Sequence, residues 1–136
     1  GLNVAKRIGA IKNAFAPMPK IYASSPADYE FAIKSLYGRL RDTYERAVEE
    51  IIFSDIVRRG VDVIQTQMLR NVTLPDDLAI RFHDGMTRAN THSHDNPASD
   101  TDQFTAHLRE FEQLIGDFKS AKATVEAARP QMKHKR

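Results

Sequence analysis

Apolar residues recur every three or four positions along most of the chain, and no segment alternates apolar and polar residues with a period of two. The longest stripe lies between residues 29 and 52. Its members are Tyr29, Ala32, Ile33, Leu36, Tyr37, Leu40, Tyr44, Ala47, Val48, Ile51 and Ile52. Ser25 suits an N-cap, Pro26 a first helical position and Asp28 a capping box. The pattern predicts one helix of about seven turns that ends near Phe53.

A shorter helix is predicted over residues 3–16. Val4, Ile8, Ile11 and Phe15 are spaced four, three and four apart, which is a heptad seam. Pro17 and Pro19 should end this helix. A seam of this length fits the stump of a longer coiled coil and equally a plain amphipathic helix, so both interpretations stay open.

Two further helices are predicted in the second half of the chain. Thr73 should cap the first, whose apolar face carries Leu78, Phe82 and Met86; it should fray near Asn90 and give way to a polar loop over residues 91–98. Ser99 should cap the last helix, with Asp102 as its box partner and Pro130 as its end. Its apolar positions again step like heptads: Phe104, Leu108, Phe111, Ile115, Phe118 and Val125. Residues 55–72 give a weaker helical pattern.

These elements predict an all-α fold, an antiparallel bundle of about four main helices whose first and last members resemble coiled-coil helices. Glycines at positions 38 and 85 lie inside predicted helices. Glycine in a helix costs about 1 kcal/mol against alanine, and we expect a close helix crossing at Gly38 to explain its presence. The expected division is a coiled-coil stump and linker over residues 1–22, a helical domain over residues 23–128 and a basic tail over residues 129–136.

Composition excludes several classes of chemistry. None of the 136 residues is cysteine, which rules out disulfides, thiolate catalysis and cysteine-based zinc sites. No apolar run is long enough to span a membrane, and the N-terminus lacks the apolar core of a signal peptide, so we expect a cytoplasmic protein that does not bind membranes. The chain begins with glycine, as expected of a piece cut from a longer protein. No glycine-rich phosphate loop of the P-loop type is present, so this piece cannot itself be an ATPase module.

Charged residues on the longest predicted helix form the first candidate site. Arg41, Glu45 and Glu49 are spaced by four and share one face, where Arg41 and Glu45 can pair. A solvated ion-pair ladder would show the same spacing. Arg39 and Arg58 add positive charge that could bind phosphate, although the net charge is only +2 and does not by itself indicate nucleic acid.

The second candidate lies between Arg88 and Asp95. Histidine suits proton transfer near neutral pH and arginine suits a phosphate oxygen, so Arg88 and His94 could serve metal-independent RNA cleavage. Asp95 could orient the His94 ring, and the alternative is a polar surface loop. A metal site built from His83, Asp84, His92, His94 and Asp95 matches no standard ligand spacing. We therefore expect no metal and no cofactor.

Three blocks of the chain resemble a group of bacterial ATPases whose ABC/SMC-like head is interrupted by a coiled coil. Residues 35–53 resemble the block LYxRLRxTWERAVEE near the C-terminus of that group, residues 65–69 resemble QTQRL, and residues 85–95 resemble GM…HD. The group is in turn similar to the PrrC and RloC anticodon nucleases, whose nuclease parts are assigned to the helical, dimeric HEPN superfamily. The blocks occur in the same order here and cover roughly residues 30 to 96.

The resemblance implies an effector domain attached to an ATPase head, in the same or a longer chain, that cleaves RNA in phage defence. Arg41, Glu45 and His94 match the arginine, glutamate and distant histidine of the anticodon nucleases in order and in the arginine–glutamate spacing. Arg88 and His94 fit the HEPN pattern of arginine, four to six residues, then histidine. The implied partners are RNA, with tRNA one candidate, and a second copy of the chain. The alternative is a non-catalytic helical module for dimerisation or partner binding.

Overall fold

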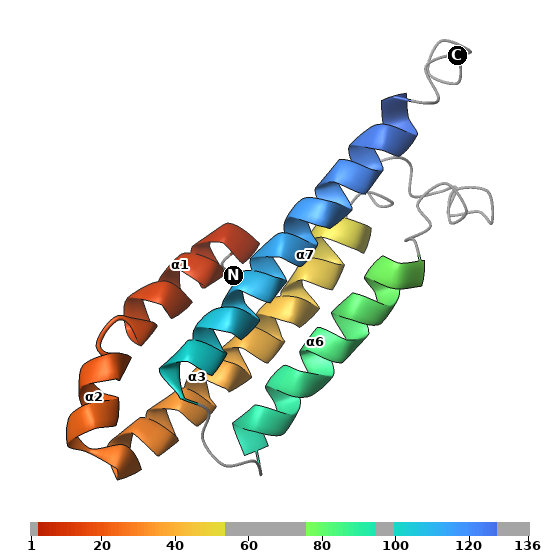
Figure 1. Cartoon of the computed structure of the whole chain (residues 1–136). Coiled ribbons are helices and arrows are strands. Elements are labelled where there is room, and N and C mark those ends of the chain that lie inside the picture. The colour runs from red at the N-terminus through yellow and green to blue at the C-terminus, as the bar shows by residue number, and fades with distance from the viewer. Residues whose placement is uncertain (1–2, 54–75, 95–99, 128–136) are drawn as a thin grey trace.

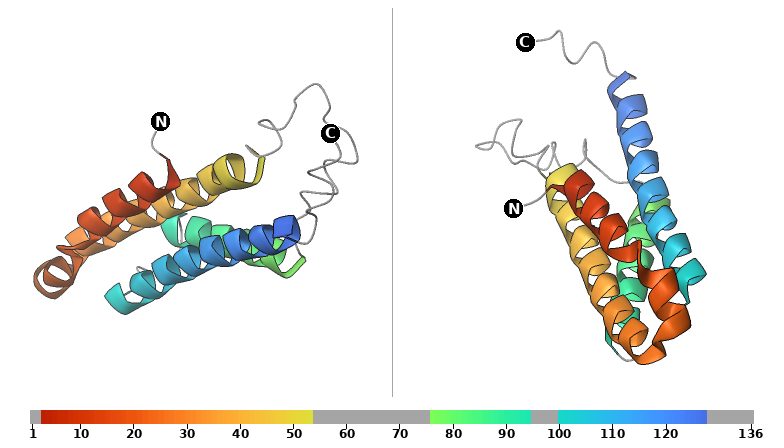
Figure 2. Two further views of the ribbon diagram at one scale, coloured as in Figure 1. Left: turned by 90° about the horizontal axis from the view of Figure 1, so that it is seen from above. Right: turned by 90° about the vertical axis from the view of Figure 1, so that its left-hand side faces the viewer.

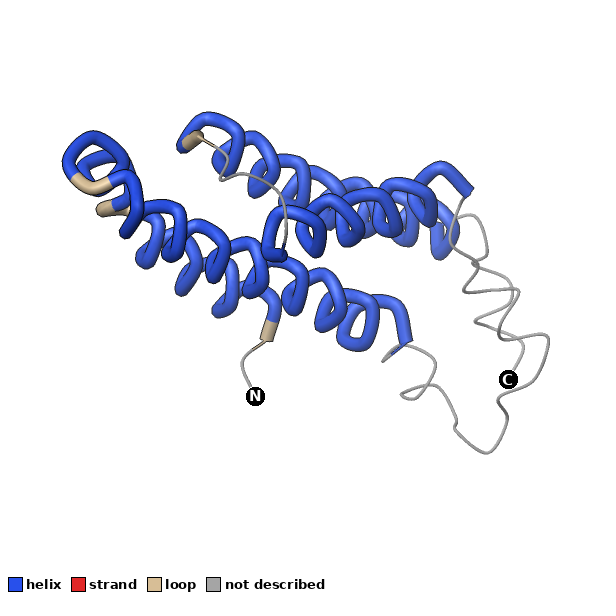
Figure 3. Tube along the Cα trace, turned by 90° about the horizontal axis from the view of Figure 1, so that it is seen from below, coloured by secondary structure: helices blue, strands red, loops and turns tan. Residues whose placement is uncertain are grey.

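The protein is an all-α bundle (Figures 1 and 3). The structure, a computed structural model, describes residues 3–53, 76–94 and 100–127, and these residues contain helices and no strand. Its elements are α1 (Val4–Phe15), α2 (Met18–Ser24), α3 (Pro26–Ala47), the π-helix η1 (Val48–Phe53), α6 (Asp76–His94) and α7 (Thr101–Ala127). The predictions for residues 54–75, Thr73 among them, lie outside the described residues.

The three long helices α3, α6 and α7 alternate in direction along the chain. Tyr37 of α3 packs on His92 and Tyr44 lies against Gly85, so α6 runs opposite to α3. Arg81 forms an ion pair with Asp117, and Arg88 forms one with Glu110, so α7 runs opposite to α6. Figure 2 shows the resulting arrangement in two layers, with α1 and α2 beside α3 in one layer and α6 beside α7 in the other.

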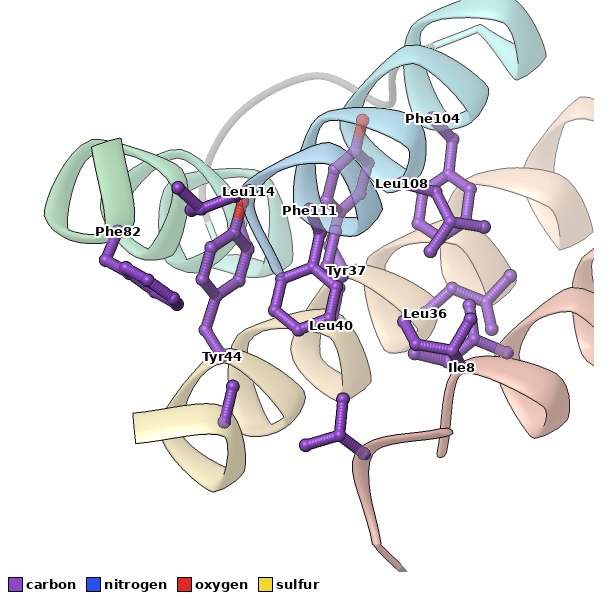
Figure 4. Packing of buried hydrophobic residues seen from close by; sticks show 14 of the residues in the cluster. Ile8, Leu36, Tyr37, Leu40, Tyr44, Phe82, Phe104, Leu108, Phe111 and Leu114 are labelled. Carbon is purple, nitrogen blue, oxygen red and sulfur yellow. The ribbon is translucent and has the colours of Figure 1, made fainter. Parts of the chain in front are cut away.

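One core joins all the helices. α3 supplies its largest share, through Tyr29, Ile33, Leu36, Tyr37, Leu40, Thr43, Tyr44 and Ala47, each of which is buried. Figure 4 shows Tyr44 reaching between Phe82 of α6 and Phe111 of α7. Ring centroids of Tyr44 and Phe111 lie 4.6 Å apart in an edge-to-face arrangement, which aromatic pairs prefer. The apolar stripe read from the sequence is therefore the face of α3 that the other helices cover.

The heptad seam of the first helix is buried in this same core. Val4, Ile8 and Ile11 are buried, and the Phe15 ring stacks on Phe104 of α7 with centroids 4.9 Å apart. The N-terminus of α1 is fixed by Asn3, whose Oδ1 accepts from the Lys6 amide, and by Glu50 of η1, whose Oε2 accepts from the Val4 amide at 3.0 Å. In this structure the seam packs within the bundle itself.

Three local predictions need correction. Pro17 and Pro19 do end α1, but α2 follows at once over Met18–Ser24, because proline is tolerated in the first turn of a helix. Ser25 precedes α3 as expected, yet its hydroxyl donates to the Asp28 carboxylate and caps no backbone amide. The cap of α7 is Asp100, whose Oδ1 accepts from the Gln103 amide at 2.7 Å. Ser99 lies outside the described residues.

The fourth correction concerns the predicted polar loop. α6 does not fray near Asn90; it continues to His94. Ala89 is buried, His92 packs on Tyr37, and Ser93 lies against Gly38. These contacts with α3 keep a run of polar residues helical.

No described helix is both long and apolar enough to cross a lipid bilayer.

Candidate functional site

The end of α6 that carries the histidines lies against the middle of α3. The rings of Tyr37 and His92 are stacked with centroids 4.7 Å apart. A Cβ added to Gly38 would lie 3.8 Å from Cβ of Ser93, an ordinary van der Waals distance. Ser93 directly precedes His94, and Gly38 comes one turn before Arg41 in α3. Because α3 and α6 run antiparallel, Arg41 lies on one side of the contact between Gly38 and Ser93 along the helix pair, and His94 lies on the other side. The contact at Gly38 is of ordinary length and does not require glycine; the close crossing of α3 and α6 is at Gly85, where an added Cβ would overlap Tyr44.

Arg41 and Glu45 form the ion pair that their spacing predicts. Arg41 Nη1 donates to Glu45 Oε1 at 3.0 Å, and Nη2 donates to Asp42 Oδ1 at 2.8 Å. The Arg41 side chain is 36% exposed and Glu45 is 50% exposed, so water screens the pair and it contributes little to stability. The two carboxylates instead fix the direction of the guanidinium, whose remaining N–H groups can bind an oxyanion.

His94 is exposed and is the last residue of α6. At about 100° per residue, His94 points roughly 140° away from the buried Ala89 and roughly 120° away from Arg88. Arg88 faces α7, where its Nη2 pairs with the Glu110 carboxylate. Within one chain, Arg88 and His94 therefore lie on different faces of α6. Asp95, the residue expected to orient His94, lies outside the described residues.

The remaining predicted residues lie in different surroundings. Arg39 is exposed, and its backbone carbonyl accepts from the Thr43 hydroxyl. Glu49 belongs to η1 and lies 3.6 Å from Arg46, so it pairs with that residue and not with Arg41. Arg58 lies outside the described residues. Among the described residues, no group of three or more histidine, aspartate or glutamate side chains could hold a metal ion.

A second polar group, which sequence reasoning did not single out, joins α3, α6 and α7. We call it the three-ring cluster: Tyr37, His92 and His107. The Tyr37 hydroxyl and His107 Nδ1 are hydrogen-bonded at 2.7 Å, and the two imidazole centroids lie 5.3 Å apart. His107 stands three residues after Phe104 and four before Phe111, both fully buried, so its helical spacing is the signal that could have placed it at the edge of the core.

Both imidazoles of the three-ring cluster favour the neutral form. Burial lowers the pKa of His92, and the Arg88 guanidinium lowers it further. Burial also lowers the pKa of His107; His92 and Arg88 act in the same direction, while the Glu110 carboxylate opposes them. A neutral His107 that carries its proton on Nε2 can accept a hydrogen bond from the Tyr37 hydroxyl at Nδ1.

Comparison with protein families, with characterised proteins and with solved structures finds no match to this chain.

Proposed function

We propose that this chain is the C-terminal effector domain of an ATPase and that it cleaves RNA without a metal ion, in the manner of the anticodon nucleases, in defence against phage. The observation that supports the proposal is the packing of the C-terminal turns of α6 on the middle of α3, where Ser93, the neighbour of His94, lies against Gly38, one turn before Arg41. The resemblance in three blocks points to the same arginine, glutamate and histidine.

The proposed chemistry needs one proton acceptor and one cation. His94 takes the proton of a ribose 2′-hydroxyl, and the 2′-oxygen attacks the adjacent phosphorus. The bond from phosphorus to the 5′-oxygen breaks, the 5′-oxygen takes a proton from water, and a 2′,3′-cyclic phosphate is left on the other fragment. Arg41 stabilises the charge that develops on the phosphoryl oxygens. Glu45 orients Arg41 through its hydrogen bond. A homodimer would bring two copies of this site into one assembly.

The test is RNA cleavage by the purified chain in the presence of EDTA. A tRNA pool should yield discrete fragments that end in 2′,3′-cyclic phosphate. His94→Ala and Arg41→Ala should each lower the rate by about 100-fold or more, the usual contribution of a positioned proton-transfer or oxyanion-binding group. His83→Ala on α6 and Arg109→Ala on α7 are matched controls, because both residues are exposed and lie outside the proposed site. Cleavage that survives His94→Ala would refute the assignment.

A non-catalytic dimerisation or partner-binding module is the second candidate. Two observations favour it: both arginines of the proposed chemistry are paired with carboxylates, Arg41 with Glu45 and Arg88 with Glu110, and Phe31 on α3 is 81% exposed. Under this alternative a folded, dimeric chain would leave RNA intact. Phe31→Ala would then weaken association in sedimentation experiments, whereas Arg41→Ala would not.

A further inference from the structure

The three-ring cluster lies where α3, α6 and α7 meet, near the C-terminal end of α6. Tyr37 is fully buried and contacts both imidazoles, through its ring to His92 and through its hydroxyl to His107. Phe104 packs edge to face on the same Tyr37 ring, with centroids 4.9 Å apart. The cluster therefore ties the last turn of α6 to both α3 and α7, two residues before His94.

The last turn of α6 has few other anchors among the described residues. Asn90, Thr91 and His94 are exposed, and the Thr91 and Ser93 hydroxyls donate to carbonyls of their own helix. Helix ends with little buried apolar surface open first. The ring of His92 is the largest side chain in this turn that packs against another helix, where it stacks on Tyr37.

We propose that His92 is a positioning residue: its ring, stacked on Tyr37 and supported by His107, holds the last turn of α6 against α3 and so fixes the position of His94. The ring geometry carries the positioning claim, and its consequence for RNA cleavage rests on the proposed function. His92 is stacked on Tyr37, and His107 Nδ1 is hydrogen-bonded to the Tyr37 hydroxyl, so under this proposal both rings act through the position of His94.

The same geometry makes the last turn of α6 sensitive to pH. The groups that face the two imidazoles are Tyr37 from α3, Arg88 from α6 and Glu110 from α7. Protonation of both rings places two cations side by side near Arg88, and the Glu110 carboxylate offsets part of the repulsion. Because the pKa values of both histidines are lower in the folded state, the folded state binds fewer protons than the unfolded state in this pH range. Their contribution to the stability of this turn is therefore complete at neutral pH and is lost as the pH falls below the ordinary histidine pKa of about 6.5.

Amide hydrogen exchange in the full chain tests the positioning claim directly. At pH 7.5, His92→Ala should speed the exchange of the amides of residues 91–94 by about tenfold or more relative to the wild type, while His92→Phe, which keeps a stacking ring, should stay within about twofold. After correction for intrinsic rates, the wild type should exchange faster at pH 5.5 than at pH 7.5, and His92→Phe should reduce this difference. His83→Ala is the control.

The cleavage assay separates this inference from the proposed function. His92→Ala should lower kcat with little change in KM, and His92→Phe should restore kcat. Exchange of residues 91–94 that His92→Ala leaves unchanged would overturn the positioning claim. Faster exchange with an unchanged kcat would overturn its role in cleavage. If the wild type cleaves no RNA, the proposed function fails, and the exchange data still decide whether the cluster holds the turn.

Discussion

Gly85→Ala is expected to lower the free energy of unfolding by about 1–3 kcal/mol, the usual cost of placing an extra methyl group in a packed core. A Cβ at this position would lie 2.5 Å from Cζ of Tyr44 and closer still to the hydroxyl oxygen. Tyr44 cannot easily move aside, because it is buried between Phe82 and Phe111 (Figure 4). Urea denaturation should show the loss as a lower midpoint with an unchanged slope.

Two other helical glycines provide the controls for this prediction. A Cβ at Gly9 of α1 or at Gly116 of α7 would meet no atom within 4 Å. Gly9→Ala and Gly116→Ala should therefore raise stability by up to about 1 kcal/mol through helix propensity alone. Tyr44→Leu should relieve part of the cost of Gly85→Ala in a double-mutant cycle. Equal effects at Gly85 and Gly116 would show that α3 and α6 do not cross as closely as described.

Phe111→Ala is the other substitution with a large expected effect, a loss of about 3–5 kcal/mol in the free energy of unfolding. Phe111 is fully buried, and its ring packs edge to face on Tyr44. Truncation removes the transfer free energy of the ring and leaves a cavity where α3, α6 and α7 meet. Thermal or urea denaturation monitored by far-ultraviolet circular dichroism measures the change.

Phe31→Ala is the matched control for Phe111→Ala, since the same atoms are removed from a side chain that is 81% exposed. Its stability should stay within about 0.5 kcal/mol of the wild type. Similar losses at the two positions would contradict the assignment of the core face of the bundle.

The helical period was sufficient to predict the fold class and the core face of α3, because apolar spacing reports directly which side of a helix is covered. It failed at the end of α6, where Asn90, Thr91 and His92 look like a loop by composition. Tertiary contacts decide that segment: the packing of His92 on Tyr37 is invisible without knowing which helices are neighbours. The predicted N-cap of α7 was wrong by one residue, because Asp100, which directly follows Ser99, is also a residue type that caps helices.

The candidate site could also be predicted only in part from the sequence. The Arg41–Glu45 pair follows from spacing within one helix and was predictable. The partner of Arg88 was not, because Glu110 comes from another helix and the two meet only in the assembled bundle. Spacing in a presumed loop paired Arg88 with His94, and the continuation of α6 as a helix places them on different faces.

The claim on which the functional account depends is that Arg41 and His94 bind one phosphate together. The direct test is a nuclear magnetic resonance titration of the full chain with a 2′-O-methylated RNA oligonucleotide, which can bind but has no 2′-hydroxyl to react. The account predicts that the Arg41 guanidinium and the His94 imidazole signals shift together, at one common RNA concentration, while His83 and Lys119 stay unchanged. Saturating RNA that moves neither signal, or only one of them, would contradict it.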